Sequence, residues 1–257
     1  MDFNLSEQQR SYVETVRKFV KVEIIPRVLE MDRQHEFPFP IIRRAWDLGI
    51  LNLSIPGAVK GYEIDAVSSA LIIAEMSYGD SGIATSAMCN DLANAVIAQH
   101  GTDSQQEALL RPFVEAPLLA SFCLTEPGAG SDNSALTTYL RRREDGTYLL
   151  NGAKCFITNA SFASQFTVFA KVGKPTGNFM ACVIIPVPAP SQAEMAGGFP
   201  QGREITLPGG GRISVGKPED KLGQRLSNTA AVTFEDVVVT PEQIIGDRRL
   251  GFRYVIE

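Results

Sequence analysis

The sequence predicts an α+β protein of more than one domain, with an N-terminal helical bundle followed by a small antiparallel β barrel or sandwich. Three observations predict this fold class. Apolar residues recur at helical spacing up to about Pro117, and short alternating strands follow from Leu118. A glycine-containing loop lies just after this change of period. A chain of 257 residues is long enough for two domains with separate cores.

Capping residues outline the predicted helical domain, residues 1–117. Side chains that can accept hydrogen bonds from free backbone N–H groups stand at three helix starts: Ser6 with Gln9, Asp65, and Thr102 with Gln105. Pro26 interrupts the first helical pattern, whereas Pro40 suits the first turn of the next helix. The amphipathic stripes of these helices are expected to form the core of a bundle.

Short strands between turn residues make up the predicted β domain, residues 118–239. The pairs Asp145-Gly146 and Asn151-Gly152 are tight-turn sequences that join antiparallel strands. Strands with such connections are typical of a small antiparallel barrel or sandwich.

Two segments depart from this pattern. Segment 189–217 is rich in Pro and Gly, and we expect it to form a short hairpin or a flexible surface insertion away from Thr125 and Thr158. Residues 240–257 become helical again and are predicted to start a C-terminal helical domain that this sequence does not complete.

Composition excludes several classes of function. The net charge of −5 disfavours a nucleic-acid partner, because phosphate contacts need clustered Lys and Arg. The two histidines and four scattered cysteines show no metal-ligand spacing, so no metal site is expected. No apolar run approaches the roughly 20 residues of a membrane span. The polar N-terminus resembles no secretory or transit segment, so a cytoplasmic location is expected.

The candidate binding residues begin in the stretch 121–132, SFCLTEPGAGSD. A short apolar strand opens here into a loop with glycines at alternate positions, which lets the backbone come close to an anion. Thr125 and Ser131 add hydroxyls that can donate to ring carbonyls or phosphate oxygens. A plain connecting loop is the alternative interpretation of this stretch.

A second candidate stretch is the strand that follows Asn151-Gly152. Regular alternation places Phe156 and Thr158 on one face. An aromatic ring beside a hydroxyl donor suits a planar heteroaromatic ligand, because the ring stacks while the hydroxyl meets an edge heteroatom. Packing of Phe156 in an ordinary sheet core is the alternative.

Three stretches in this order resemble the signatures of the acyl-CoA dehydrogenase family of flavoproteins. They are L-T-E-P-G-A-G-S-D within 123–132, N-G-A-K-C-F-I-T-N-A at 151–160, and K-L-G-Q-R-L-S-N-T followed by F-E-D-V-V-V within 221–239. The resemblance covers nearly the whole chain. It implies FAD as cofactor, and the family's flavin-contacting positions correspond to Phe122, Cys123, Leu124, Thr125, Glu126, Pro127, Gly128, Ala129, Gly130, Ser131, Phe156, Ile157 and Thr158.

The resemblance also implies roles for single residues. Thr125 would donate to the edge of the flavin ring, and Thr158 would lie near flavin N5. Ser131 would bind a phosphate of FAD and also the CoA part of the substrate. Most members carry Trp where this chain has Phe156. Glu126 is interpreted as structural, and no catalytic residue is assigned within the chain.

The family reaction is the α,β-desaturation of an acyl-CoA thioester in fatty acid metabolism, with hydride passing to flavin N5. The family's catalytic Glu lies in the C-terminal domain, so this chain is expected to be inactive by itself. Electron-transfer flavoprotein is the expected electron acceptor, and a homotetramer the expected assembly of a full-length member. A non-catalytic flavin or acyl-CoA binding module and an acyl-CoA oxidase are the alternatives, and a DNA-associated relative is disfavoured by the acidic charge.

Overall fold

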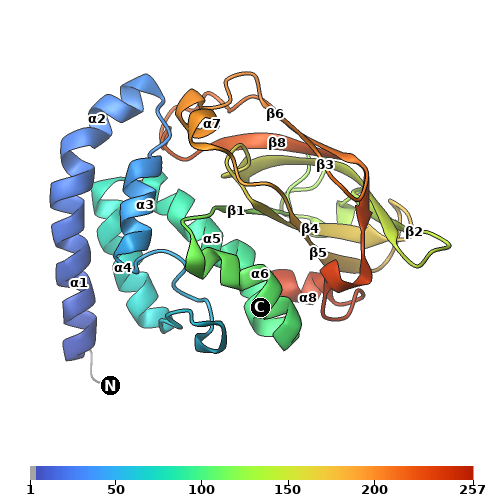
Figure 1. Ribbon diagram of the computed structural model, residues 1–257, viewed down its shortest axis with the longest axis horizontal. Coiled ribbons are helices and arrows are strands. Elements are labelled where there is room, and N and C mark those ends of the chain that lie inside the picture. Colours follow the sequence, from blue (N-terminus) through green and yellow to red (C-terminus); the bar gives the residue numbers. More distant parts are fainter. Residues whose placement is uncertain (1–3, 257) are drawn as a thin grey trace.

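The computed structural model describes residues 4–256 and shows helices on one side of a folded sheet (Figure 1). The helices of the first part of the chain are α1 (Glu7–Phe19), α2 (Ile25–Gln34), α3 (Phe39–Asp47), α4 (Ala66–Gly79), α5 (Ser81–His100) and α6 (Asp103–Glu115), with short 3-10 turns at Gly57–Val59 and Asn133–Ala135. The predicted caps are confirmed, because Ser6, Asp65 and Thr102 each accept hydrogen bonds from backbone N–H groups of the first turn.

The interruption predicted at Pro26 takes the form of a π-helical turn, Val20–Ile24, between α1 and α2. Pro26 lies in the first turn of α2, directly after the π-helical turn. The helix therefore continues across the proline instead of ending there. Pro40 lies in the first turn of α3, as predicted.

The second part of the chain forms a sheet, whose strands are β1 (Ala120–Cys123), β2 (Tyr139–Arg142), β3 (Tyr148–Thr158), β4 (Gln165–Val172), β5 (Met180–Pro186), β6 (Arg203–Thr206), β7 (Arg212–Val215), β8 (Thr229–Val239) and β9 (Ile244–Ile245). The order is β6-β7-β8-β3-β2-β4-β5-β9, with β1 also paired to β4. Most pairs are antiparallel, but β1 and β2 both run parallel to β4. The predicted α+β class is confirmed, although the sheet does not close into a barrel.

The sheet folds over itself around an apolar core. The rings of Phe166 on β4 and Phe234 on β8 lie 6.2 Å apart, although these strands are not neighbours in the sheet. The other face of β4 and β5 is covered by α5 and α6 (Figure 1), where Phe169 and Cys182 pack with Ile97 and Leu110. Helices and sheet therefore share one packed interface beside β1.

The segment 189–217 forms more structure than the sequence predicted. It contains α7 (Gln192–Gly197) and the antiparallel hairpin β6–β7. The hairpin alternative is confirmed, and the segment also packs against the rest of the chain. Phe199 packs edge-on against Phe162 at 5.6 Å, and the buried Arg203 donates to the carbonyls of Ala163 and Pro188.

The end of the described chain returns to helix as predicted. After the short turn Pro241–Gln243 and strand β9, α8 covers Gly251–Ile256. Because β9 pairs with β5, the sheet extends past the predicted limit at Val239. None of the helices within 4–256 is long and apolar enough to cross a membrane.

Candidate functional site

The two candidate stretches lie side by side. The backbone N–H of Cys155 on β3 donates to the carbonyl oxygen of Thr125 at 3.0 Å. At the end of the same strand, the hydroxyl of Ser121 on β1 donates to the carbonyl oxygen of Thr158 at 2.7 Å. These contacts join the loop after β1 to the last residues of β3, so their predicted ligand-binding residues share one region of the molecule.

The loop itself is a tight turn. Glu126 and Ala129 exchange two backbone hydrogen bonds of 3.0 Å, which leaves Pro127 and Gly128 exposed at the tip. A Cβ atom built on Gly128 or Gly130 would meet no atom within 4 Å. The chain itself therefore does not crowd these glycines, and the space above the loop is open to another molecule.

Three candidate hydroxyls are unused by the protein. Thr125 and Thr158 are half-buried and Ser131 is exposed. Within residues 4–256, none of their side-chain oxygens has a hydrogen-bond partner, whereas the hydroxyls of Ser121 and Thr137 are both bonded. Hydroxyl groups in this state can bind a ligand without breaking an internal contact.

Phe156 lies on a β-bulge. The pairing of β3 with β8 shifts between Lys154 and Ile157, and Phe156 has a left-handed backbone with φ of 58°. Bulges change the direction of a side chain, and here the ring is 67% exposed while Ile157 is buried. The alternative that Phe156 belongs to the sheet core is therefore wrong.

The other predicted residues face inward or pack against neighbours. The side chains of Cys123, Ala129 and Ile157 are buried. Phe122 packs its ring 5.1 Å from that of Phe169, and Leu124 is half-buried beside the same cluster. Cys123, Ala129 and Ile157 therefore have only backbone atoms to offer a ligand.

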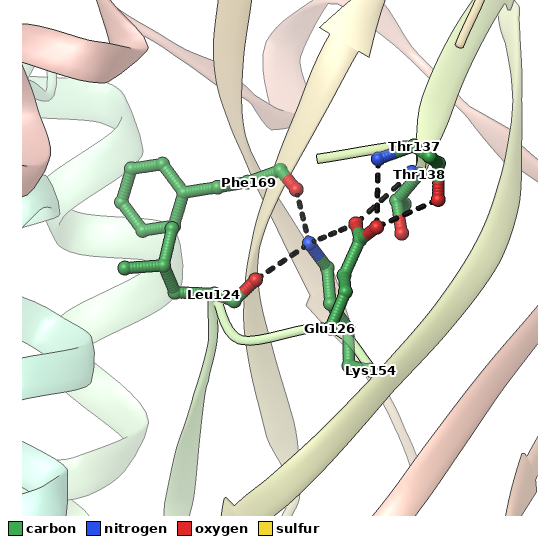
Figure 2. A network of polar contacts seen from close by, with 6 residues as sticks. All are labelled: Leu124, Glu126, Thr137, Thr138, Lys154 and Phe169. Carbon is green, nitrogen blue, oxygen red and sulfur yellow. Dashed lines mark hydrogen bonds and ion pairs between the residues drawn. The ribbon is translucent and has the colours of Figure 1, made fainter. Parts of the chain in front are cut away.

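Glu126 is held in a buried ion pair (Figure 2). Its carboxylate accepts a hydrogen bond of 2.8 Å from the Lys154 ammonium, and the two side chains are only 3% and 0% exposed. Burial opposes ionisation, but the hydrogen bonds from Lys154, Thr138 and Thr137 outweigh it and lower the pKa of Glu126 to about 2. The carboxylate is thus ionised and fully bonded, as expected for a structural group.

Sequence reasoning missed Lys154. Its side chain is among the largest that are fully buried. Burial lowers the pKa of this ammonium, and Glu126 opposes that shift. A lysine inside an otherwise apolar strand was the available signal, because a buried lysine needs a partner.

The third family stretch contributes the neighbour of Thr158. Thr229 at the start of β8 pairs with Thr158 in the sheet. It also lines a cavity of about 140 Å³ together with Ser227 and Asn228 from the preceding loop and His35 from the helical part. Within residues 4–256, no group of three or more His, Cys, Asp or Glu side chains is arranged to hold a metal ion.

Together the fold and this surface define a helical and β-sheet protein whose junction presents an aromatic ring and free hydroxyls. Comparison with known proteins identifies the family. Residues 6–116 match the acyl-CoA dehydrogenase N-terminal domain, and residues 121–237 match the acyl-CoA dehydrogenase middle domain. The chain belongs to the acyl-CoA dehydrogenase family through these two domains.

Individual relatives belong to the same family. The chain is 32% identical over 98% of its length to a probable medium-chain specific acyl-CoA dehydrogenase of Caenorhabditis briggsae. Among solved structures, it is similar to butyryl-CoA dehydrogenase of Megasphaera elsdenii, with 33% identity over 99% of the chain and a TM-score of 0.83. An acyl-CoA dehydrogenase of Bacillus anthracis, solved as a complex with FAD, is 28% identical over 98% of the chain with a TM-score of 0.82.

The matches differ in how much of the relative they cover. The chain spans 58% of the Caenorhabditis briggsae protein, 62% of the Megasphaera elsdenii chain and 40% of the Bacillus anthracis chain. The family membership therefore holds for the N-terminal and middle domains.

Proposed function

We propose that this chain forms the part of an FAD-dependent acyl-CoA dehydrogenase that holds the flavin ring and pyrophosphate. One observation carries the proposal. The exposed ring of Phe156 lies on a strand that is hydrogen-bonded to the loop of Thr125, whose hydroxyl has no partner within residues 4–256. An aromatic face beside free donors fits a planar heteroaromatic ring, and the open space above Gly128 and Gly130 fits a pyrophosphate.

Each residue then has a defined role. Phe156 packs against the flavin ring, Thr125 donates to an oxygen at the ring edge, and Thr158 donates near N5. Ser131 binds a phosphate of FAD and the CoA part of the substrate. The inward-facing residues of the loop contribute their backbone and hold its shape.

The proposed reaction is the removal of two hydrogens from an acyl-CoA thioester to give the α,β-unsaturated product. FAD, when bound, supplies the acceptor for the β-hydrogen as hydride. A carboxylate must take the α-proton while hydrogen bonds polarise the thioester carbonyl. Both carboxylates of the candidate loop already accept hydrogen bonds within the chain. Glu126 accepts one from Lys154, and Asp132 accepts one from the backbone N–H of Ser134 at 3.0 Å. As the family resemblance implies, we place the base in the C-terminal domain of the whole protein.

The partners follow from the same proposal. An acyl-CoA is the substrate, and electron-transfer flavoprotein is the electron acceptor. The whole protein assembles as a homotetramer and acts in fatty acid metabolism. We also propose a cytoplasmic location.

A non-catalytic flavin or acyl-CoA binding module is the second candidate. It is favoured by the engagement of both loop carboxylates within the chain itself. Turnover separates the two: a whole protein containing this chain is expected to reduce an artificial electron acceptor with an acyl-CoA, whereas a binding module reduces none. Consumption of oxygen in place of that acceptor would indicate an oxidase.

The test of the cofactor site is a titration of the purified chain with FAD, followed by quenching of flavin fluorescence and by the visible spectrum. Because part of the family's FAD site lies outside this chain, we expect weak saturable binding that Phe156→Ala weakens further. Phe179→Ala is the matched control, because Phe179 is also an exposed phenylalanine, at 53%, outside both candidate stretches. Absence of saturable binding, or equal loss in both variants, would contradict the proposed site.

A further inference from the structure

We propose that Lys154 and Glu126 are positioning residues for the flavin site. Their buried ion pair sets the spacing between the loop of Thr125 and the strand of Phe156 and Thr158. The inference rests on the proposed function, since it assigns the buried pair to the same site. Neither side chain would touch the ligand, because both are buried beneath the loop.

The lysine end of the pair joins three parts of the sheet (Figure 2). The Lys154 ammonium donates to the carbonyl of Leu124 at 2.9 Å, to the carbonyl of Phe169 at 2.8 Å and to Glu126 at 2.8 Å. An ammonium has three N–H donors, so all of them are used. One group on β3 thereby fixes the start of the candidate loop and the middle of β4.

The carboxylate end fixes the loop to the chain that leads into β2. Glu126 accepts hydrogen bonds from the backbone N–H of Thr137 at 2.7 Å and of Thr138 at 3.0 Å. The hydroxyl of Thr137 donates to the same carboxylate at 2.7 Å. Glu126 therefore anchors the buried side of the tight turn.

The pair lies close in the chain to the proposed flavin contacts on both segments. Thr125 lies between Leu124 and Glu126, which are both bonded to Lys154. On β3, Cys155 lies between Lys154 and Phe156, and its N–H donates to the carbonyl of Thr125. A shift of the ammonium would therefore move the Thr125 hydroxyl relative to the Phe156 ring. Binding sites depend on such spacing within about 0.5 Å.

Stability alone gives no reason to keep an ion pair here. A buried ion pair adds little net stability compared with apolar side chains of similar volume, while loss of one partner leaves an unpaired charge. What an apolar pair cannot supply is the set of directed hydrogen bonds to Leu124, Phe169, Thr137 and Thr138. The positioning role explains why charged groups occupy this site.

The test is the double variant Glu126→Leu with Lys154→Met, which removes both charges together and leaves neither unpaired. We expect it to fold, to bind FAD about tenfold more weakly, and to shift the visible spectrum of the flavin that it binds. The single variant Glu126→Gln, which keeps the size and one acceptor oxygen, is expected to give a smaller loss of affinity. The matched control replaces the surface pair Arg17–Glu75, whose side chains are 53% and 19% exposed, by Met and Leu and leaves binding unchanged.

A measurement without FAD separates this proposal from the proposed function. In the flavin-free chain, the Cys155 amide is protected from hydrogen exchange by its bond to Thr125. We expect about tenfold faster exchange of this amide in the double variant and no change in the Arg17–Glu75 control.

Unchanged exchange, or a double variant that folds and gives the affinity and spectrum of the unaltered chain, would overturn the inference. A double variant that does not fold would also overturn it, because the pair would then act on stability. Failure of the unaltered chain to bind FAD would reject the proposed function but leave the exchange result standing.

Discussion

The loop 121–132 and the segment 189–217 have similar composition, but they differ in which polar side chains are hydrogen-bonded within the protein. Both are rich in Gly and Pro, and both leave the sheet and return to it. In the segment, Ser191 and Glu194 cap α7 by reciprocal hydrogen bonds, and Ser214 donates to Glu204 across the hairpin. In the loop, Thr125 and Ser131 have no partner within residues 4–256. A half-buried hydroxyl without an internal partner, as at Thr125, and not glycine content, distinguishes the candidate binding loop from this segment.

The two regions are also anchored differently. The loop is held by a buried ion pair in which every donor is used, whereas the segment is held by Arg203 bonded to two carbonyls and by the packing of Phe199. If this comparison is correct, damage to the first anchor changes stability and flavin binding together. Damage to the second changes stability only.

The largest effect is expected from Lys154→Met alone. It leaves the Glu126 carboxylate buried without its cation, and removing one partner of a buried pair costs about 3–5 kcal/mol. We expect the free energy of unfolding to fall by this amount in urea denaturation. The Arg17→Met variant, which removes an exposed partner of Glu75, should leave the transition nearly unchanged. Equal stability of Lys154→Met and the unaltered chain would show that the pair is not an anchor.

Acid should weaken the same anchor. The folded protein holds the pKa of Glu126 at about 2, below the ordinary value of 4.5, so its contribution to stability is complete above pH 4.5 and is lost as the pH falls towards 2. The shift corresponds to about 3 kcal/mol at 1.36 kcal/mol per pKa unit. Urea denaturation at pH 6 and pH 3 measures the loss. Glu126→Gln should lose less stability between these values, and an equal loss would assign the acid sensitivity to other groups.

The anchor of segment 189–217 predicts a smaller loss. Arg203→Met leaves the carbonyls of Ala163 and Pro188 without their donor, and an unsatisfied buried group costs about 1–3 kcal/mol. The matched control is Arg212, which is exposed, lies on the same hairpin and pairs with Glu235 of β8. It should tolerate Met with little change. FAD affinity should be the same in both variants. A loss of affinity in Arg203→Met alone would show that the segment belongs to the flavin site.

The loop 121–132 and the strand β3 beside it could be located from the sequence because their signals are local. Capping residues, turn pairs and the motif from Cys123 to Asp132 each depend on residues close in the chain. The order of the strands, the parallel pairing of β1 with β4 and the open edges of the sheet depend on contacts between distant residues, which periodicity does not report.

The partner of Lys154 and the packing of segment 189–217 could not be predicted for the same reason. The partner of Lys154 is 28 residues away, and Arg203 donates to a carbonyl 40 residues away. The bulge at Phe156 was missed because strict alternation assumes equal residue counts on both strands, whereas two residues here oppose one. The exposed ring nevertheless agrees with the predicted ligand face.

The smallest expected effect is also the most specific to the loop. Thr125→Val keeps the shape of the side chain and removes a hydroxyl that bonds to nothing within residues 4–256. We therefore expect the urea transition to be unchanged within about 0.5 kcal/mol, as for substitutions that break no internal contact. FAD affinity should fall by about threefold to tenfold, because one neutral hydrogen bond contributes roughly 0.5–1.5 kcal/mol. Thr137→Val is the matched control, because it also removes a threonine hydroxyl, but one that donates to Glu126. It should lower stability more than Thr125→Val does, and its binding loss should follow only from movement of the loop. If Thr125→Val were as destabilising as Thr137→Val and bound FAD normally, the free hydroxyl would have no function in binding, and the contrast between the two regions would fail.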